Sequence, residues 1–256
     1  MGLIVKLSGT TFTDPTLPKL YRDSILNAGS MLLFDFKTLA TYAGGVAPAA
    51  GMLANGFAMN NLVDAAPAAT VNGATVAYNA AGAIEFNGSG NLTFGDNYNL
   101  ASSNADFLNI MWIKMTAASA AYAQLFGRST TTTAGNTQYR LDMGADGLTP
   151  RGSAGGANNI GTVTIPPTSA QALNTVFQVA YSRVGTAINA YWNGIKIRDY
   201  TAFNETGLAN PATTPNMGGG VKGLVYRAYM ENLTVSGKNP LAQVQADYAA
   251  NSARFV

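Results

Sequence analysis

Four Asn-Gly dipeptides divide this chain into short segments, and they constrain its fold more than any other feature of the sequence. They stand at residues 55–56, 72–73, 87–88 and 193–194, and Asp146-Gly147 is a further turn signal of the same kind. Asn, Asp and Gly tolerate a positive φ, which both central positions of the favoured two-residue hairpin turn require. Short apolar runs stand between these turns, as strands would. The spacing predicts an all-β chain with tight hairpin turns.

The clearest hairpin brackets Asn193-Gly194. Residues 187–192 run into this turn and residues 195–198 leave it, with isoleucines at alternate positions and basic residues between them. This alternation predicts that the isoleucine face is buried and the other face solvated. Many short strands separated by turn signals favour a two-sheet antiparallel β-sandwich of jelly-roll type. Further strands are expected at 31–36, 84–86, 92–94, 109–115, 124–126, 139–143, 176–181 and 224–234.

One helix is clearly signalled, near the C-terminal end. Asn239 suits the N-cap, and Pro240 suits the first helical position. Leu241, Val244 and Tyr248 then recur at helical spacing. We expect this short helix to pack on the rim of the sandwich.

Residues 1–29 differ from the rest of the chain, and residues 10–20 show neither the strand period nor the helical period. Residues 10–20 (TTFTDPTLPKL) contain two prolines and predict an extended arm, which precedes a sandwich domain at 30–256. Two interpretations stay open: the arm packs on its own domain, or it docks on a neighbouring subunit. Its candidate anchors for assembly are Phe12, Leu17, Leu20 and Tyr21.

Two residue types on which much enzyme chemistry depends are missing. The chain has no cysteine and no histidine, which excludes disulfides, thiolate nucleophiles, imidazole bases and serine-type triads. Only 11% of the residues are charged, so few carboxylates remain for acid–base work. The basic residues are scattered, and we expect no nucleic-acid partner. We therefore expect a protein that is not an enzyme.

The N-terminal residues do not resemble a targeting signal. Residues 1–6 (MGLIVK) lack a basic segment followed by a long apolar one. The uncharged stretch at 38–63 is interrupted by Pro48, glycines and asparagines, so no membrane insertion is expected. A surface protein without an export signal fits a component of a virus particle, made in the host cytoplasm.

Several motifs occur in the order found in concanavalin A-like and laminin-G-like jelly-roll domains. Residues 84–92 (IEFNGSGNL) resemble the F-x-G-x-G-x-L strand pair of these domains, and residues 107–114 (FLNIMWIK) resemble their next core strand. Residues 177–181 and 191–194 resemble their W-h-x-V-A-x-T and Y-V-N-G hairpin. The likeness implies a concanavalin-like β-sandwich, with the extended arm before it and the short helix near its end. It carries over no calcium-ligand pair.

This resemblance leaves several functions open, because one fold hosts many activities. The class includes lectins, glycoside hydrolases and structural domains of bacteriophage particles. Composition, arm and missing export signal resemble phage virion proteins. We expect a structural protein of the head decoration or of the tail and baseplate, assembled in multiple copies with other virion proteins. The alternative is a tail or fibre module that binds a host-surface carbohydrate.

Sugar binding by this fold would use loop aromatics that stack on a ring and amides that bind hydroxyls. Such residues are also the ordinary surface of a charge-poor protein. Trp112 and Trp192 are expected in the core instead, because both stand in strands. The candidates for glycan binding are Tyr98, Tyr122, Asn158 and Asn159.

Few carboxylates stand close enough together to cooperate. Asp142 and Asp146 flank a turn and could approach each other, as a glycosidase pair or as calcium ligands. A solvated strand residue and a turn aspartate explain them more simply. Residues 95–99 (GDNYN) form another oxygen-rich cluster without EF-hand spacing. We expect no catalytic residue, no metal site and no cofactor, with calcium left as an alternative.

Overall fold

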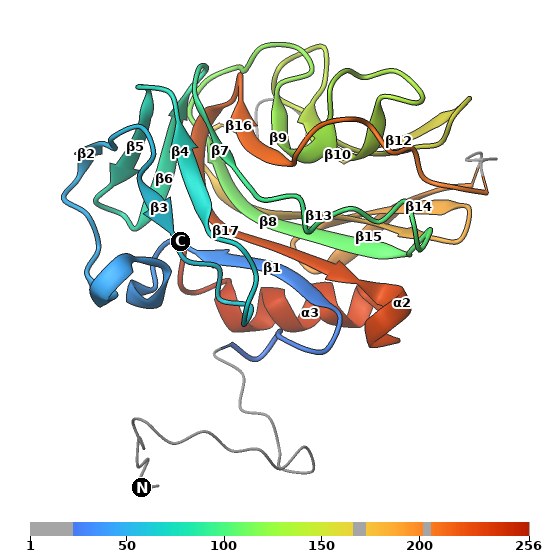
Figure 1. The fold of residues 1–256 in the computed structure, drawn as a ribbon, viewed down its shortest axis with the longest axis horizontal. Coiled ribbons are helices and arrows are strands. Elements are labelled where there is room, and N and C mark those ends of the chain that lie inside the picture. The colour runs from blue at the N-terminus through green and yellow to red at the C-terminus, as the bar shows by residue number, and fades with distance from the viewer. Residues whose placement is uncertain (1–22, 166–172, 202–205, 256) are drawn as a thin grey trace, which may run out of the picture.

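The computed structural model describes residues 23–165, 173–201 and 206–255, which form two antiparallel sheets packed face to face (Figure 1). The strands of sheet A are β1 (Ser30–Asp35), β2 (Gly51–Met52), β5 (Val76–Asn79), β6 (Ala83–Asn87), β8 (Phe107–Met115), β13 (Val176–Val184), β14 (Ala187–Trp192), β15 (Ile195–Tyr200) and β17 (Lys222–Asn232). Their order is β15-β14-β13-β8-β17-β6-β5-β2, and β1 also pairs with β17.

Sheet B is the second layer of the sandwich. Its strands are β3 (Ala58–Met59), β4 (Ala69–Asn72), β7 (Asn91–Thr93), β9 (Gln124–Ser129), β10 (Thr137–Met143), β11 (Pro150–Gly155), β12 (Ile160–Thr164) and β16 (Asn216–Gly219). They follow the order β12-β11-β10-β9-β16-β7-β4-β3. The predicted two-sheet antiparallel β-sandwich is confirmed.

The Asn-Gly dipeptides mark turns, but only the one at 193–194 closes a hairpin within a sheet. The dipeptides at 55–56, 72–73 and 87–88 lie where the chain passes from one sheet to the other, between β2 and β3, β4 and β5, and β6 and β7. The glycine of each dipeptide has a positive φ. A sharp reversal needs this conformation in either setting. The prediction of hairpins at these three turns is therefore wrong, although the turns themselves are present.

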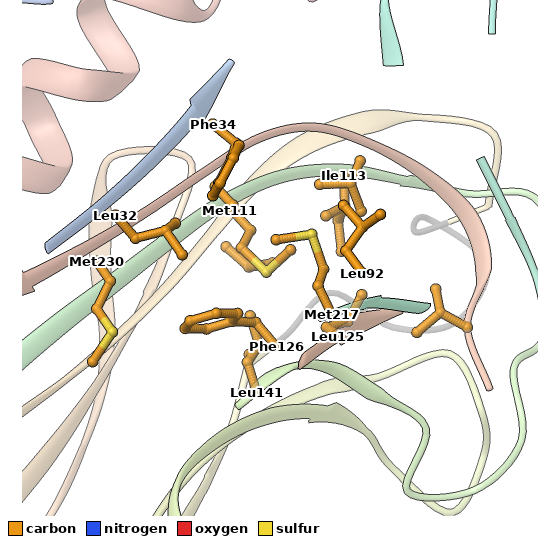
Figure 2. Close-up of a cluster of buried hydrophobic side chains, with 14 of the residues drawn as sticks. Leu32, Phe34, Leu92, Met111, Ile113, Leu125, Phe126, Leu141, Met217 and Met230 are labelled. Atoms are coloured by element: carbon orange, nitrogen blue, oxygen red, sulfur yellow. The ribbon is translucent and has the colours of Figure 1, made fainter. Parts of the chain in front are cut away.

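The hydrophobic core fills the space between the sheets. Figure 2 shows side chains of β1, β8 and β17 facing side chains of β7, β9, β10 and β16. The sheets approach closely at Gly152 of β11, where a Cβ atom would lie 2.5 Å from Cγ of Tyr181 in β13. The labelled core residues are Leu32, Phe34, Leu92, Met111, Ile113, Leu125, Phe126, Leu141, Met217 and Met230.

The outer face of sheet A is covered by the helix α3 (Pro240–Asn251), which follows the short helix α2 (Leu233–Ser236). Asn239 caps α3 by accepting a hydrogen bond from the backbone N–H of Ala242 at 3.1 Å, as its sequence predicts. Tyr248 stacks on Trp112 of β8 with ring centroids 5.6 Å apart. The helix therefore lies across a sheet face and not on the rim, and Trp112 is a core residue. Within the described ranges, no helix has the length and hydrophobicity needed to span a bilayer.

An ionic cluster is buried between α3 and sheet A. Arg227 of β17 pairs with Asp247 of α3 at 2.9 Å, with Asp35 of β1 at 3.1 Å and with Asp23 at 2.9 Å. Residues 23–29 pack beside this cluster through the buried side chains of Ile25 and Leu26. The four predicted anchors of the arm lie outside the described residues, so its assembly role stays a prediction.

The isoleucine face of the predicted 187–198 hairpin is not buried as expected. Ile195 is 64% exposed, because β15 is the edge strand of sheet A and a bulge opposite Ala190 and Tyr191 breaks its alternation. Ile197 is only partly buried against the core. Lys196 and Asp199 pair along the same strand. These charges oppose pairing with another chain.

Candidate functional site

The outer face of sheet B is polar where β10, β11 and β12 run side by side. Alternation along β10 buries its apolar residues in the core and sends Arg140 and Asp142 to the outer face. The strand register places Arg140 opposite Ser153 of β11 and Asp142 opposite Arg151. Ser153 in turn lies opposite Thr162 of β12. Cross-strand neighbours project to the same face, so these side chains form one polar floor.

A pocket of about 220 Å³ lies over this floor. Its rim comes from three separate parts of the chain. Tyr122 lies in the β8–β9 connection, Thr132 lies in the β9–β10 connection, and Ile160 begins β12. The pocket thus combines a charged and hydroxyl-bearing floor with an aromatic side chain at its mouth.

Two arginines share one aspartate at the bottom of the pocket, and we call Arg140, Asp142 and Arg151 the Arg–Asp–Arg triad. Arg140 Nε donates to Oδ2 of Asp142 at 2.7 Å, and Arg151 Nε donates to Oδ1 at 3.2 Å. The Asp142 side chain is 1% exposed, that of Arg140 is 8% exposed and that of Arg151 is 21% exposed. The triad is therefore anchored at its carboxylate and opens to the pocket at its guanidinium groups.

Burial raises the pKa of Asp142, and the positive charges of Arg151 and Arg140 offset only part of this effect. Asp23 behaves in the opposite way: its hydrogen bonds and its attraction to Arg227 outweigh burial and lower its pKa. A raised pKa means that the folded state holds the Asp142 proton more tightly than the unfolded state does. The ionised form of Asp142 thus weakens the fold at neutral pH. A perturbed charged group in a cleft is typical of functional sites.

Hydrogen bonds of its backbone N–H and its backbone carbonyl hold Tyr122 at the edge of the pocket. Its N–H donates to the carbonyl of Met143 at 3.0 Å, and its carbonyl accepts a hydrogen bond from Arg140 Nη2. The guanidinium carbon of Arg151 lies 4.6 Å from the centre of the Tyr122 ring. Tyr122 is 44% exposed and has a φ of 61°, a conformation that is uncommon for a residue with a side chain. These contacts fix an aromatic ring beside the pocket.

The other three predicted glycan-binding residues lie elsewhere. Tyr98 stands in a loop but is 1% exposed, packs edge-on against Phe94 and accepts a hydrogen bond from Asn61 Nδ2. It cannot meet a ligand, because the aromatic cluster that fills this end of the core encloses it. Asn158 is exposed and Asn159 half-buried at the β11–β12 turn, and neither lines the pocket.

The two acidic clusters noted in the sequence have structural partners. Asp146 accepts hydrogen bonds from the backbone N–H groups of Leu148 and Thr149, and the Thr149 hydroxyl contributes most to lowering its pKa. Asp96 forms an ion pair with Arg128. Among the described residues, no group of three or more carboxylates is arranged to hold a metal ion. The expectation of no metal site, with calcium as the alternative, is not tested by these contacts and stays a prediction.

Most of this floor was not predicted from the sequence. Residues 139–143 were expected as a strand, and alternation within that strand already places Arg140 and Asp142 on one face. Arg151 had no such signal, because β11 (PRGSAG) contains proline, glycine and serine and has no strand-like composition. Its position next to Asp142 depends on the pairing of β10 with β11.

Comparisons with known proteins support the fold. No protein-family model matches the chain, and no curated protein is similar to it in sequence. Among solved structures, the receptor-binding domain of botulinum neurotoxin C/D mosaic serotype is similar with a TM-score of 0.63 and 11% identity, over 88% of this chain and 52% of that one.

Two more solved structures show the same likeness. The binding domain of botulinum neurotoxin DC in complex with SialylT has a TM-score of 0.62 and 12% identity, over 89% of this chain and 52% of that one. Trypanosoma rangeli sialidase in complex with sialic acid has a TM-score of 0.55 and 13% identity, over 91% and 34%. The chain thus spans about half the length of the toxin domains and a third of the sialidase. At such identities the likeness supports a jelly-roll-like β-sandwich.

Proposed function

We propose that this chain is a carbohydrate-binding module without catalytic activity, and that one sugar ring binds in the pocket on the outer face of sheet B. One observation carries the proposal: the half-exposed ring of Tyr122 is held beside a floor of guanidinium, carboxylate and hydroxyl groups. A sugar ring offers apolar C–H groups on its faces and hydroxyls around its edge. An aromatic ring complements the first, and charged and hydroxyl groups complement the second.

The size of the pocket fits this reading. At about 220 Å³ it is smaller than the roughly 300–1,000 Å³ typical of sites for drug-sized ligands. One ring of a glycan would therefore enter it, while the rest of the chain would extend over the exposed surface. The floor is built on paired strands, which hold binding groups more rigidly than loops do.

The comparisons support binding as the activity. Both toxin structures are described as binding domains, and one of them is a complex with SialylT. This chain spans only part of those proteins, and the similarity concerns the fold and not particular residues. The expected structural role in a phage particle has no support from these comparisons. The alternative reading, recognition of a carbohydrate at a host surface, is the one that the pocket favours.

Binding rather than cleavage is proposed because the described lining of the pocket contains a single carboxylate. Glycoside hydrolysis generally uses two carboxyl groups on opposite sides of the scissile bond. Asp142 is the carboxylate among the described lining residues, and both of its oxygens are occupied by arginine Nε groups. Asp146, its nearest acidic neighbour in sequence, accepts the hydrogen bonds of the β10–β11 turn instead.

The test is saturation-transfer NMR and a glycan array, with the wild-type chain and two variants of Tyr122. Tyr122→Ala should abolish or strongly weaken sugar binding, because the stacking ring is lost, whereas Tyr122→Phe should retain most of it. Ile195→Ala, which removes another exposed apolar side chain from the opposite sheet, is the matched control and should bind normally. A folded wild-type chain that binds no sugar in either assay would overturn the proposal.

A further inference from the structure

Hydrogen-bond donors outnumber acceptors in the pocket. An arginine side chain has five N–H donors and no acceptor. Arg140 uses its Nε for Asp142 and its Nη2 for the Tyr122 carbonyl. Arg151 uses only its Nε, which donates to Asp142. Among the described residues, nothing accepts a hydrogen bond from Nη1 of Arg140 or from either terminal nitrogen of Arg151.

These three nitrogen atoms are also accessible. None of them belongs to the buried polar atoms that lack a hydrogen-bond partner, so each one reaches solvent. Arg140 and Arg151 both line the pocket, and these N–H groups are the ones on their side chains that no described residue accepts. A ligand that fills the pocket must therefore accept hydrogen bonds from guanidinium groups, or leave them desolvated and unpaired at a cost.

The charge balance points in the same direction. The lining contains two arginines and one aspartate, which leaves one positive charge uncompensated in the described pocket. Each oxygen of Asp142 accepts a hydrogen bond from an arginine Nε. Asp142 acts as a positioning residue that holds the two guanidinium groups on one side of the pocket. The Tyr122 ring, 4.6 Å from the guanidinium carbon of Arg151, supports that group from another side.

We propose that the sugar bound in this pocket carries a carboxylate, and that the terminal nitrogens of Arg151, with Nη1 of Arg140, bind it. The proposal rests on the proposed carbohydrate-binding function and names its ligand class. A carboxylate presents two oxygens in one plane, which matches the planar fork of a guanidinium group and accepts two parallel hydrogen bonds. It also neutralises the extra positive charge. The hydroxyls of Ser153 and Thr162, 3.4 Å apart on the floor, remain for the hydroxyls of the same sugar.

The experiment compares sugars that differ only in charge. An array and saturation-transfer NMR would present sialate- and uronate-bearing glycans beside their methyl esters, their unmodified neutral cores and sulfated versions of those cores. Titration calorimetry would then measure the affinity of the strongest ligand. We expect the free carboxylates to bind at least about tenfold more tightly than their methyl esters, since the ester removes the charge and one paired acceptor. This preference should weaken as salt concentration rises.

Arg151 is the residue to change, because Asp142 keeps Arg140 as a partner when Arg151 is removed. Arg151→Ala should reduce the affinity for the carboxylated glycan about tenfold or more, and Arg151→Lys should restore only part of it, because lysine lacks the fork. Arg198→Ala, at an exposed position on β15 of the other sheet, is the matched control and should leave affinity unchanged. Thermal unfolding would confirm that each variant is folded.

The outcomes separate this inference from the proposed function. Equal binding of carboxylated glycans and their methyl esters would overturn the carboxylate inference and leave carbohydrate binding in place. Binding of sulfated glycans alone would overturn it as well. Carboxylate-selective binding that Arg151→Ala leaves unchanged would place the site elsewhere and also overturn it. Failure of every glycan to bind the folded wild-type chain would overturn both proposals.

Discussion

At the scale of single residues, two buried arginine clusters have opposite relations to stability. Arg227 is surrounded by three aspartates on the outer face of sheet A, and its interactions with Asp23 lower the pKa of that carboxyl. The Arg–Asp–Arg triad holds an aspartate whose pKa burial raises. The first arrangement stabilises the ionised form of its aspartate in the folded chain. In the second, burial favours the protonated form of the aspartate over its ionised form in the folded chain.

Asp23→Asn should destabilise the fold at neutral pH. Because the pKa of Asp23 is lower in the folded chain, its stabilising effect is present above the ordinary aspartate pKa and is lost as pH falls through the folded value. We expect a loss of about 1–3 kcal/mol at pH 7 and a smaller difference at pH 3, measured by urea unfolding. Asp199→Asn, at an exposed ion pair with Lys196, should change stability by less than about 0.5 kcal/mol. An Asp23→Asn effect that is equal at both pH values would contradict this account.

Gly152→Ala should separate the sheets locally. The added Cβ would lie 2.5 Å from Cγ of the Tyr181 ring, and neither the buried ring nor the paired strand can move away freely. Overpacking of this kind typically costs about 1–3 kcal/mol. Gly207→Ala, where a Cβ meets nothing within 4 Å, is the matched control. If the Gly152→Ala chain unfolded at the same urea concentration as the wild-type chain, the two sheets would be able to accommodate the added methyl group, which would contradict this account.

At the scale of elements, α3 is the segment whose local sequence and final structure agree best. Asn239 and Pro240 specify its start, and the apolar spacing that follows specifies a face to bury. The main strands of the core could also be predicted from the sequence, because a long apolar run such as β8 is recognisable without its neighbours. The sequence did not reveal β2, β3, β4, β5, β12 or β16, and although the Asp146-Gly147 turn predicts a partner strand for β10, it did not give the bounds of β11. These strands are two to six residues long, and several are rich in glycine, alanine or asparagine, so pairing with neighbours stabilises them more than propensity does.

Asn239→Ala should weaken α3 by removal of its N-cap. The Asn239 side chain accepts the hydrogen bond of the Ala242 N–H, and loss of such a cap costs about 1 kcal/mol. The drop should appear in urea unfolding and as faster hydrogen exchange at the start of α3. Asn239→Ser keeps a capping oxygen and should recover most of the stability. Equal destabilisation by both variants would mean that the Asn239 side chain acts in some way other than capping.

At the scale of the whole molecule, the missing histidines set the pH behaviour. Few side chains have an ordinary pKa between 5 and 8 when histidine is absent, so few protons are exchanged on unfolding near neutral pH. The acidic limb of the stability curve should instead reflect carboxylates such as Asp23, whose folded pKa is lowered. Stability should therefore be flat near neutrality and fall in acid.

Thermal unfolding measured by circular dichroism would check this expectation. Between pH 6.5 and 8.5, we expect the midpoint to change by less than about 2 °C, which corresponds to at most about 1 kcal/mol for a domain of this size. A change of more than about 5 °C would contradict it. Among the described groups, the source would then be sought at Asp142, whose pKa burial raises.

Features that depend on neighbours along the chain could be predicted from the residues alone. Asn-Gly pairs set the turns, alternation set the strong strands, and Asn239 set the start of the helix, because each is governed by local backbone conformation. Tertiary structure decided the features that depend on distant segments. Pairing of β10 with β11 brought Arg151 to Asp142, the core enclosed Tyr98, and the edge position of β15 exposed Ile195. The pocket belongs to this second group, because its charges and its aromatic ring come from segments that meet only when the strands of sheet B pair.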